Sequence, residues 1–156
     1  RHFNLTPQGE KPQGDINAIT GIGFSNKGYG NTDTTNKIGK FGVGFKAVFQ
    51  YTDTPEIYDD SFKFKIEDLI VPTLIEYDYP ERQPGETLFV LPFRNPQKSF
   101  AEIKSRLETL KNPILFLRHL KKIIWRIDTA NQNNTTTEYS KTLLERHTYN
   151  DVKLEK

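Results

Sequence analysis

Three glycines, Gly39, Gly42 and Gly44, stand close together in the segment NKIGKFGVGFKAVFQY, directly before an apolar run. Glycine lets a backbone approach another group closely or adopt a positive φ angle. The apolar residues that follow recur at helical spacing and predict a helix over residues 41–51. Because free backbone amides at such a turn can cap an anion, the segment is a candidate anion site, and a plain turn is the alternative.

Two familiar phosphate-binding patterns do not fit this segment. A Walker A loop needs a lysine directly after its last glycine, but Phe45 follows Gly44 and Lys46 comes one place late. Residues 42–47 match the G-x-G-x-x-A form of the dinucleotide fingerprint, but that fingerprint must follow a buried strand. The preceding residues, YGNTDTTNK, are polar, so this pattern also fails on its context.

Composition limits the class of protein. A chain of 156 residues predicts one domain over residues 1–156, and a net charge of +2 gives no overall field that would attract nucleic acid. The absence of cysteine excludes disulfides, thiolate metal sites and a cysteine nucleophile. No apolar run approaches the roughly 20 residues that span a bilayer, so we expect a soluble cytoplasmic protein with no membrane partner. The chain starts at Arg1 and has no methionine, which indicates a piece of a larger protein.

The expected elements follow the order helices, strands, one long helix, strands. Asp15 is predicted as the N-cap of a short helix, and residues 56–67 have the alternation of an antiparallel ribbon. A short strand is expected around residues 74–77, and residues 87–93, apolar on both faces, are expected to form a central strand. This order predicts an α+β fold with a mostly antiparallel sheet covered by helices on one face.

The second half of the chain begins with an amphipathic helix, for which Ser99 is the expected N-cap. Residues 122–128 alternate as a strand does, with Trp125 toward the core and the cations toward solvent, which does not favour a nucleic-acid site. Residues 129–156 are expected to form a C-terminal hairpin extension. The histidines lack metal-ligand spacing, so no protein-only metal site is predicted.

The run IGKFGVGFKAVF resembles the glycine box of the GHKL, or Bergerat-fold, ATPase superfamily, to which gyrase, heat-shock chaperones, histidine kinases and mismatch-repair ATPases belong. Further motifs in the same order, ITGIGFSNK, FKFKIEDLIVP, GETLFVLPFR and LKNPILFLRHLKKIIW, are similar to sacsin-like ATP-binding domains over about residues 15–127. The resemblance implies a two-layer Bergerat-type sandwich with a mixed, mostly antiparallel sheet. It also implies ATP and Mg²⁺ as cofactors of the complete protein.

The resemblance assigns roles by position. Residues 25–37 would be the ATP lid, with Ser25 and Lys27 as polyphosphate contacts at its start. Thr87 in GETLFVLPF would hydrogen-bond the adenine edge together with a water. The amides that would cap the phosphates lie around Gly39, Phe41, Gly42, Val43, Gly44 and Phe45.

Two motifs of the superfamily are absent from this chain: a helix whose Glu activates water and whose Asn holds Mg²⁺, and an Asp-x-Gly whose Asp binds adenine. Because RHFN resembles the residues that follow Asp-x-Gly in sacsin-like domains, the resemblance implies an N-terminally truncated domain. No catalytic residue is therefore assigned within residues 1–156. We expect ATPase activity in the complete protein and none from this chain alone.

Two classes of function remain open. The first is an ATP-binding module, a hydrolase when complete, of a larger chaperone-like or defence-type protein, whose lid closes on Mg-ATP and changes contacts with its other domains or in a homodimer. The second is a non-catalytic protein-interaction domain that keeps the Bergerat fold without nucleotide turnover. The three glycines together with the Ser-x-Lys element favour the first class.

Overall fold

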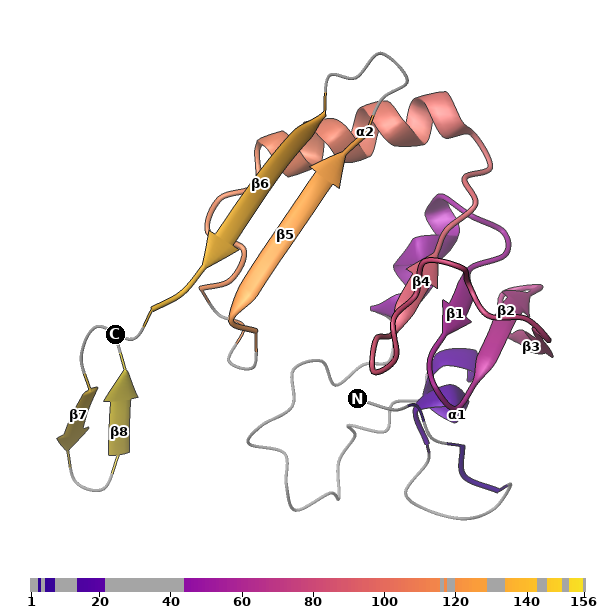
Figure 1. Ribbon diagram of the computed structural model, residues 1–156, viewed down its shortest axis with the longest axis horizontal. Coiled ribbons are helices and arrows are strands. Elements are labelled where there is room, and N and C mark those ends of the chain that lie inside the picture. The colour runs from indigo at the N-terminus through magenta and orange to yellow at the C-terminus, as the bar shows by residue number, and fades with distance from the viewer. Residues whose placement is uncertain are drawn as a thin grey trace. The chain divides into compact units, whose positions relative to one another are not determined.

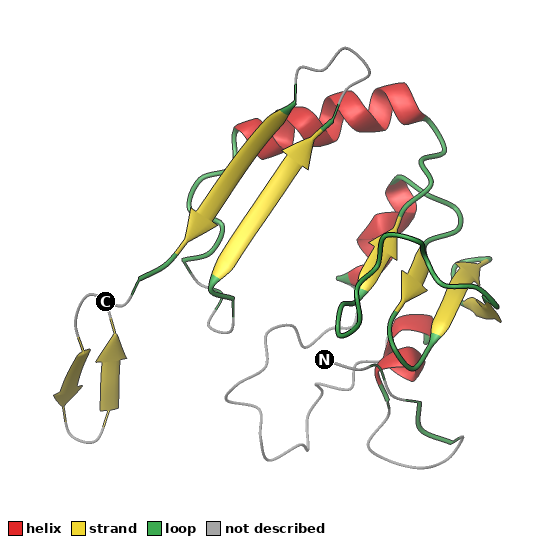
Figure 2. Ribbon diagram, in the orientation of Figure 1, coloured by secondary structure: helices red, strands yellow, loops and turns green. Residues whose placement is uncertain are grey.

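The structure, a computed structural model, describes residues 3, 5–7, 14–21, 44–115, 117, 120–128, 134–142, 146–149 and 152–155. These residues form an α+β structure in which every strand pair is antiparallel, as the sequence predicts (Figures 1 and 2). The chain divides into two compact units, Arg1–Ser99 and Phe100–Lys156. None of the helices in the described ranges is long and apolar enough to cross a membrane.

The first unit contains a sheet with the strand order β3-β2-β1-β4 (Figure 1). Its strands are β1 (Glu56–Tyr58), β2 (Lys63–Glu67), β3 (Val71–Leu74) and β4 (Leu88–Val90). The predicted ribbon of β1 and β2 is confirmed, because Phe64 and Ile66 are buried while the charged residues between them are half-buried. The alternation of side chains along an extended strand causes this pattern.

The core lies on one face of this sheet, under two short helices. Buried residues Ile57, Phe64 and Ile66 form the sheet side of the core, and Ile16 of α1 (Asp15–Thr20) packs against them. The aromatic rings of η2 (Phe45–Gln50) complete the cover. Each such buried side chain contributes roughly 1.5–3 kcal/mol, so this apolar contact holds the helices to the sheet.

The predicted N-cap of the first helix is wrong by one residue. Gly14 is the N-cap of α1, and Asp15 is its first helical residue, where a carboxylate also stabilises the helix dipole. Asn17 fixes α1 to the preceding segment, because its side-chain amide accepts from Thr6 N at 2.9 Å and donates to Thr6 O at 3.1 Å.

The helix predicted for residues 41–51 is, in its described part, the six-residue 3₁₀-helix η2. Its i→i+3 bonds include Tyr51 N to Val48 O at 2.9 Å. A segment this short between glycines and the turn before Pro55 gains little from α-helical cooperativity, and 3₁₀ geometry is common in such pieces. Phe45 and Phe49 still reach the core, as their spacing predicts.

The third strand begins earlier than expected, at Val71 and not near Leu74. A tight turn in which Ile70 N donates to Glu67 O at 3.2 Å closes the β2–β3 hairpin and sets this start. Ile75 N bonds to Lys63 O at 2.8 Å, so in the alternating pattern Pro72 occupies a position whose missing N–H would point away from β2. An edge strand tolerates proline at such a position.

The prediction of a central strand at residues 87–93 is wrong for the described part of the sheet, where β4 lies at the edge and pairs with β1 alone. The apolar residues of β4 make contacts on both faces, although Phe89 remains 45% exposed. Phe89 lies on the face of Ile57, whereas Leu88 and Val90 share the opposite face with Tyr58. Tyr58 is covered there by the ring of Tyr79, at 5.7 Å between centroids.

The long helix α2 spans Pro96–Glu108 and starts before the predicted N-cap. Asn95 is the residue that caps it, because its Oδ1 accepts from Lys98 N at 3.1 Å. Asn followed by Pro suits the N-cap and the first helical position. Ser99 lies inside the helix and is buried.

The second unit contains two separate two-stranded ladders in place of one closing hairpin. β5 (Lys122–Ile127) pairs with β6 (Thr135–Ser140), and β7 (Arg146–Tyr149) pairs with β8 (Val152–Glu155). Along β5 the predicted alternation is confirmed, since Trp125 is half-buried and Arg126 is exposed. Arg126 pairs with Asp128 at 2.8 Å, and Lys122 pairs with Glu138 at 2.9 Å.

A tight turn leads into β4. Gly85 has a φ of +84°, and Glu86 N donates to Gln83 O at 3.1 Å. Proline followed by a glycine with positive φ is the pattern of a type II β-turn. The sequence QPGE therefore determines how the chain enters the strand.

We expect Gly85→Ala to lower the free energy of unfolding by roughly 1–2 kcal/mol, because a Cβ is strained at this positive φ. The matched control is Gly44→Ala, since Gly44 has a φ of −58° and an added Cβ would meet none of the described residues within 4 Å. The control should change stability by less than about 0.5 kcal/mol. Urea denaturation of both variants provides the comparison, and equal losses would contradict this explanation.

Candidate functional site

The described end of the glycine segment is open. Gly44 is exposed, its backbone lies in the right-handed helical region, and no described atom would come within 4 Å of an added Cβ. Neither its φ angle nor the packing of its described neighbours therefore requires glycine. Among the described residues, none fills the space beside this backbone.

Phe45 attaches the glycine segment to the sheet. Its ring lies 6.1 Å from the ring of Phe89 on β4 and 6.4 Å from that of Phe49. Phe89 also contacts Phe3 at 6.3 Å. Rings at these separations pack favourably, so the residue after Gly44 has a defined place over β4.

Thr87, the predicted adenine contact, lies directly before β4 and is half-buried. It stands two residues before Phe89, which is the spacing of side chains that share a face of an extended strand. The contact between Phe45 and Phe89 thus joins the residue after Gly44 to the strand after Thr87, although the two are far apart in the sequence. Gly44 directly precedes Phe45, and Thr87 stands two residues before Phe89. Each therefore lies close in sequence to one ring of this contact.

Lys46 is directed to the β2–β3 turn. Its Nζ donates to Leu69 O at 2.9 Å and lies 5.8 Å from the centroid of the Phe49 ring. Partial burial lowers the pKa of this ammonium. The residue that misses the Walker A position by one place therefore has a structural partner within the chain.

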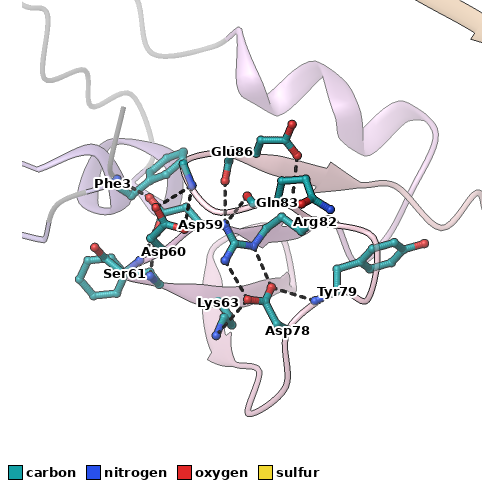
Figure 3. Close-up of polar contacts among 12 residues, drawn as sticks. Phe3, Asp59, Asp60, Ser61, Lys63, Asp78, Tyr79, Arg82, Gln83 and Glu86 are labelled. Carbon is teal, nitrogen blue, oxygen red and sulfur yellow. Dashed lines mark hydrogen bonds and ion pairs between the residues drawn. The ribbon is translucent and has the colours of Figure 1, made fainter.

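A cluster of polar side chains surrounds Arg82, in the loop before Thr87 (Figure 3). Its guanidinium binds both carboxylate oxygens of Asp78, through Nε and Nη2 at 2.8 Å each. Nη1 donates to Asp60 at 2.7 Å. The hydrogen bonds from Arg82 hold the pKa of the Asp78 carboxyl far below its ordinary value of 3.8. No sequence motif predicts this cluster, and only the Pro-Gly turn near the end of the loop indicates that the loop is ordered.

The other predicted site residues cannot be placed. Ser25, Lys27, Gly39, Phe41, Gly42 and Val43 lie outside the described residues, as does the predicted lid at residues 25–37. In the ranges that the structure describes, no three acidic or histidine side chains gather as a metal site.

Comparison with known proteins gives one partial similarity. The chain is 38% identical over 93 residues to Protein NO VEIN of Arabidopsis thaliana. The matched region covers 60% of this chain and 3% of the plant protein, so the chain spans a small part of that relative's length. No family model matches the chain, and no solved structure matches it significantly.

We expect Asp78→Asn to lower the thermal midpoint at pH 7, and the deficit to narrow as the pH falls below about 4. The folded pKa of Asp78 is depressed, so its stabilisation is present above the unfolded pKa and is lost as the pH falls toward the folded value. Thermal melts of both proteins between pH 7 and pH 2 measure this difference.

Asp53→Asn is the matched control. Asp53 pairs with Arg94, but their side chains are 65% and 56% exposed, and exposed pairs contribute little. The control should show a smaller deficit at pH 7. A deficit for Asp78→Asn that is the same at pH 7 and pH 2 would contradict a role for its charge.

Proposed function

We propose that this chain is the ATP-binding module of a larger protein, with the Bergerat-type sandwich and sacsin-like character that its motifs resemble. The observation that carries this proposal is the contact between the rings of Phe45 and Phe89, at 6.1 Å. Through it the end of the glycine segment meets the strand that Thr87 precedes. If Phe45 and Phe89 lay far apart, Gly44 and Thr87 could not be proposed for the same nucleotide site.

The chemistry of the described residues fits a nucleotide in part. The open side of Gly44 would admit a phosphate close to the backbone, where amides can donate to it. The Thr87 hydroxyl can both donate and accept, as a contact to an adenine edge or to a bridging water requires. When bound, ATP would supply a phosphoanhydride whose binding or hydrolysis can bias contacts with the rest of the protein.

The described part of the proposed site offers no set of ligands for Mg²⁺. The described residues contain no cluster of acidic or histidine side chains that could hold it. Magnesium commonly keeps most of its waters and binds through substrate phosphates and one or two protein oxygens. In the complete protein we expect that oxygen to come from residues other than those described, and we assign this chain no catalytic step.

A non-catalytic interaction domain is the second candidate, and the exposed apolar residues at β3 favour it. Leu74 is 77% exposed although its register with Phe64 places it on the face of the core. Leu69, Ile70 and Val71 are also exposed in the adjoining turn and strand. Neighbouring exposed apolar side chains are typical of surfaces that contact other proteins or domains.

We expect Gly44→Val in the full-length protein to lower ATP affinity by at least tenfold while the protein remains folded. A Cβ with two methyl groups would fill the space proposed for phosphate, and no described chain atom opposes it. Isothermal titration calorimetry with ATP, alongside a thermal melt, measures both properties. Unchanged affinity would contradict the assignment of Gly44 to the site.

ATP hydrolysis should require residues beyond those of this chain. The 156-residue chain alone should release no phosphate from ATP above background, because its sequence shows no Glu in the superfamily's water-activating pattern. The full-length protein should release phosphate under the same conditions. Equal turnover by the two would show that the catalytic groups lie within this chain, and turnover by neither would favour the non-catalytic candidate.

A further inference from the structure

We propose that Arg82 is a positioning residue for nucleotide recognition, which sets Thr87 at the start of β4 and thereby favours adenine over other bases. This inference rests on the proposed ATP site and adds to it a residue that its motifs do not contain. Arg82 does not need to touch the nucleotide. It acts through the main chain of the turn that precedes Thr87.

The contacts of Arg82 hold the loop from both ends. Besides its bonds to Asp78 and Asp60, Nη1 donates to Glu86 O at 3.0 Å and to Gln83 O at 3.2 Å (Figure 3). Glu86 is the residue directly before Thr87. The guanidinium therefore fixes the peptide group that links the turn to Thr87.

Asp60 fixes the same turn from the sheet. Its carboxylate accepts from Gly85 N at 2.9 Å and from Arg82 Nη1 at 2.7 Å. Asp60 lies two residues beyond the end of β1, the strand that pairs with β4. The turn before Thr87 is thus tied to the sheet through side chains as well as through strand pairing.

The degree of burial separates this cluster from an ordinary surface ion pair. The Arg82 side chain is only 7% exposed, whereas that of Arg94, in its pair with Asp53, is 56% exposed. Asp60 and Asp78, the partners of Arg82, are 31% and 39% exposed, so these ion pairs are only partly desolvated. A charged group held by several partners can restrict a chain to one arrangement. The arrangement restricted here is the turn that orients Thr87.

Lysine cannot replace this guanidinium. Arg presents a planar fork with five N–H donors, whereas the Lys ammonium is a compact point charge with three. Arg82→Lys would therefore keep the charge beside Asp78 but lose the simultaneous bonds to Asp60 and to the carbonyl of Glu86. We expect the turn at Pro84 and Gly85 to remain closed. The peptide group between Glu86 and Thr87 should, however, adopt a wider range of orientations.

The experiment measures ATP and GTP affinity of the full-length protein by competition against a fluorescent ATP analogue. The two ligands carry the same triphosphate and differ in the base, so their ratio reports base recognition. The wild type should prefer ATP. Arg82→Lys should weaken ATP binding about three- to tenfold, the worth of one impaired hydrogen bond, and should weaken GTP binding much less.

Arg94→Lys is the control, since it makes the same exchange at an exposed pair in the segment after β4, and should leave both affinities unchanged. Equal losses of ATP and GTP affinity in Arg82→Lys, or no loss of either, would overturn the proposal. Arg82 would then only stabilise the loop. If Arg82→Lys does not fold, the ratio of ATP to GTP affinity is measured for Asp60→Asn, with the same expected result. A wild type that binds no nucleotide would contradict the proposed function itself, and one that binds ATP and GTP equally would contradict only this inference.

Discussion

Aromatic packing on one face of the four-stranded sheet is the interaction on which the first unit depends. Phe64 and Phe89 lie on that face because both stand opposite Ile57 of β1. Phe3 contacts both of these rings, at 6.5 Å and 6.3 Å, and Phe45 contacts Phe89. The strands are three to five residues long and provide few ladder bonds, so ring packing and the burial of Phe64 add to their order, although Phe89 remains 45% exposed. The meeting of the glycine segment with the strand after Thr87 is a direct result of this packing.

How far the sequence predicted the fold depended on whether a pattern had one physical cause. The alternation at residues 63–67 has one, burial of a single face, and the strand was predicted correctly. The apolar run at β4 has two possible causes, a place between two strands or apolar contacts on its faces, and the prediction took the first, whereas β4 lies at the edge of the described sheet and Phe89 is 45% exposed. The N-cap of α2 was misplaced because Asn95 and Ser99 both suit a cap, and the prediction passed over the Asn-Pro pair.

The candidate site was predictable to the extent that it lies in local motifs. The glycines and Thr87 are visible as short patterns, but the contact of Phe45, which follows Gly44, with Phe89 of β4 is specified by no local pattern. The Arg82 cluster joins Asp78, four residues away, to Asp60, which is 22 residues away, and charged residues in an irregular connection give no sign of such pairing. Only the turn signal of Pro84 and Gly85 marked this loop as ordered.

Gly44 and Gly85 differ in what requires glycine, and this difference bears on the choice between the two classes of function. Gly85 has an internal cause, since its φ of +84° is a conformation that other residues adopt only with strain. Gly44 has none within the described chain, because its φ of −58° suits any residue and its surroundings are open. A glycine without an internal cause, adjacent to a residue packed over the strand that Thr87 precedes, has a physical reason if a ligand approaches the backbone there. An interaction surface at β3 gives no such reason for a glycine at this position, and this is why we propose the nucleotide site as the first candidate.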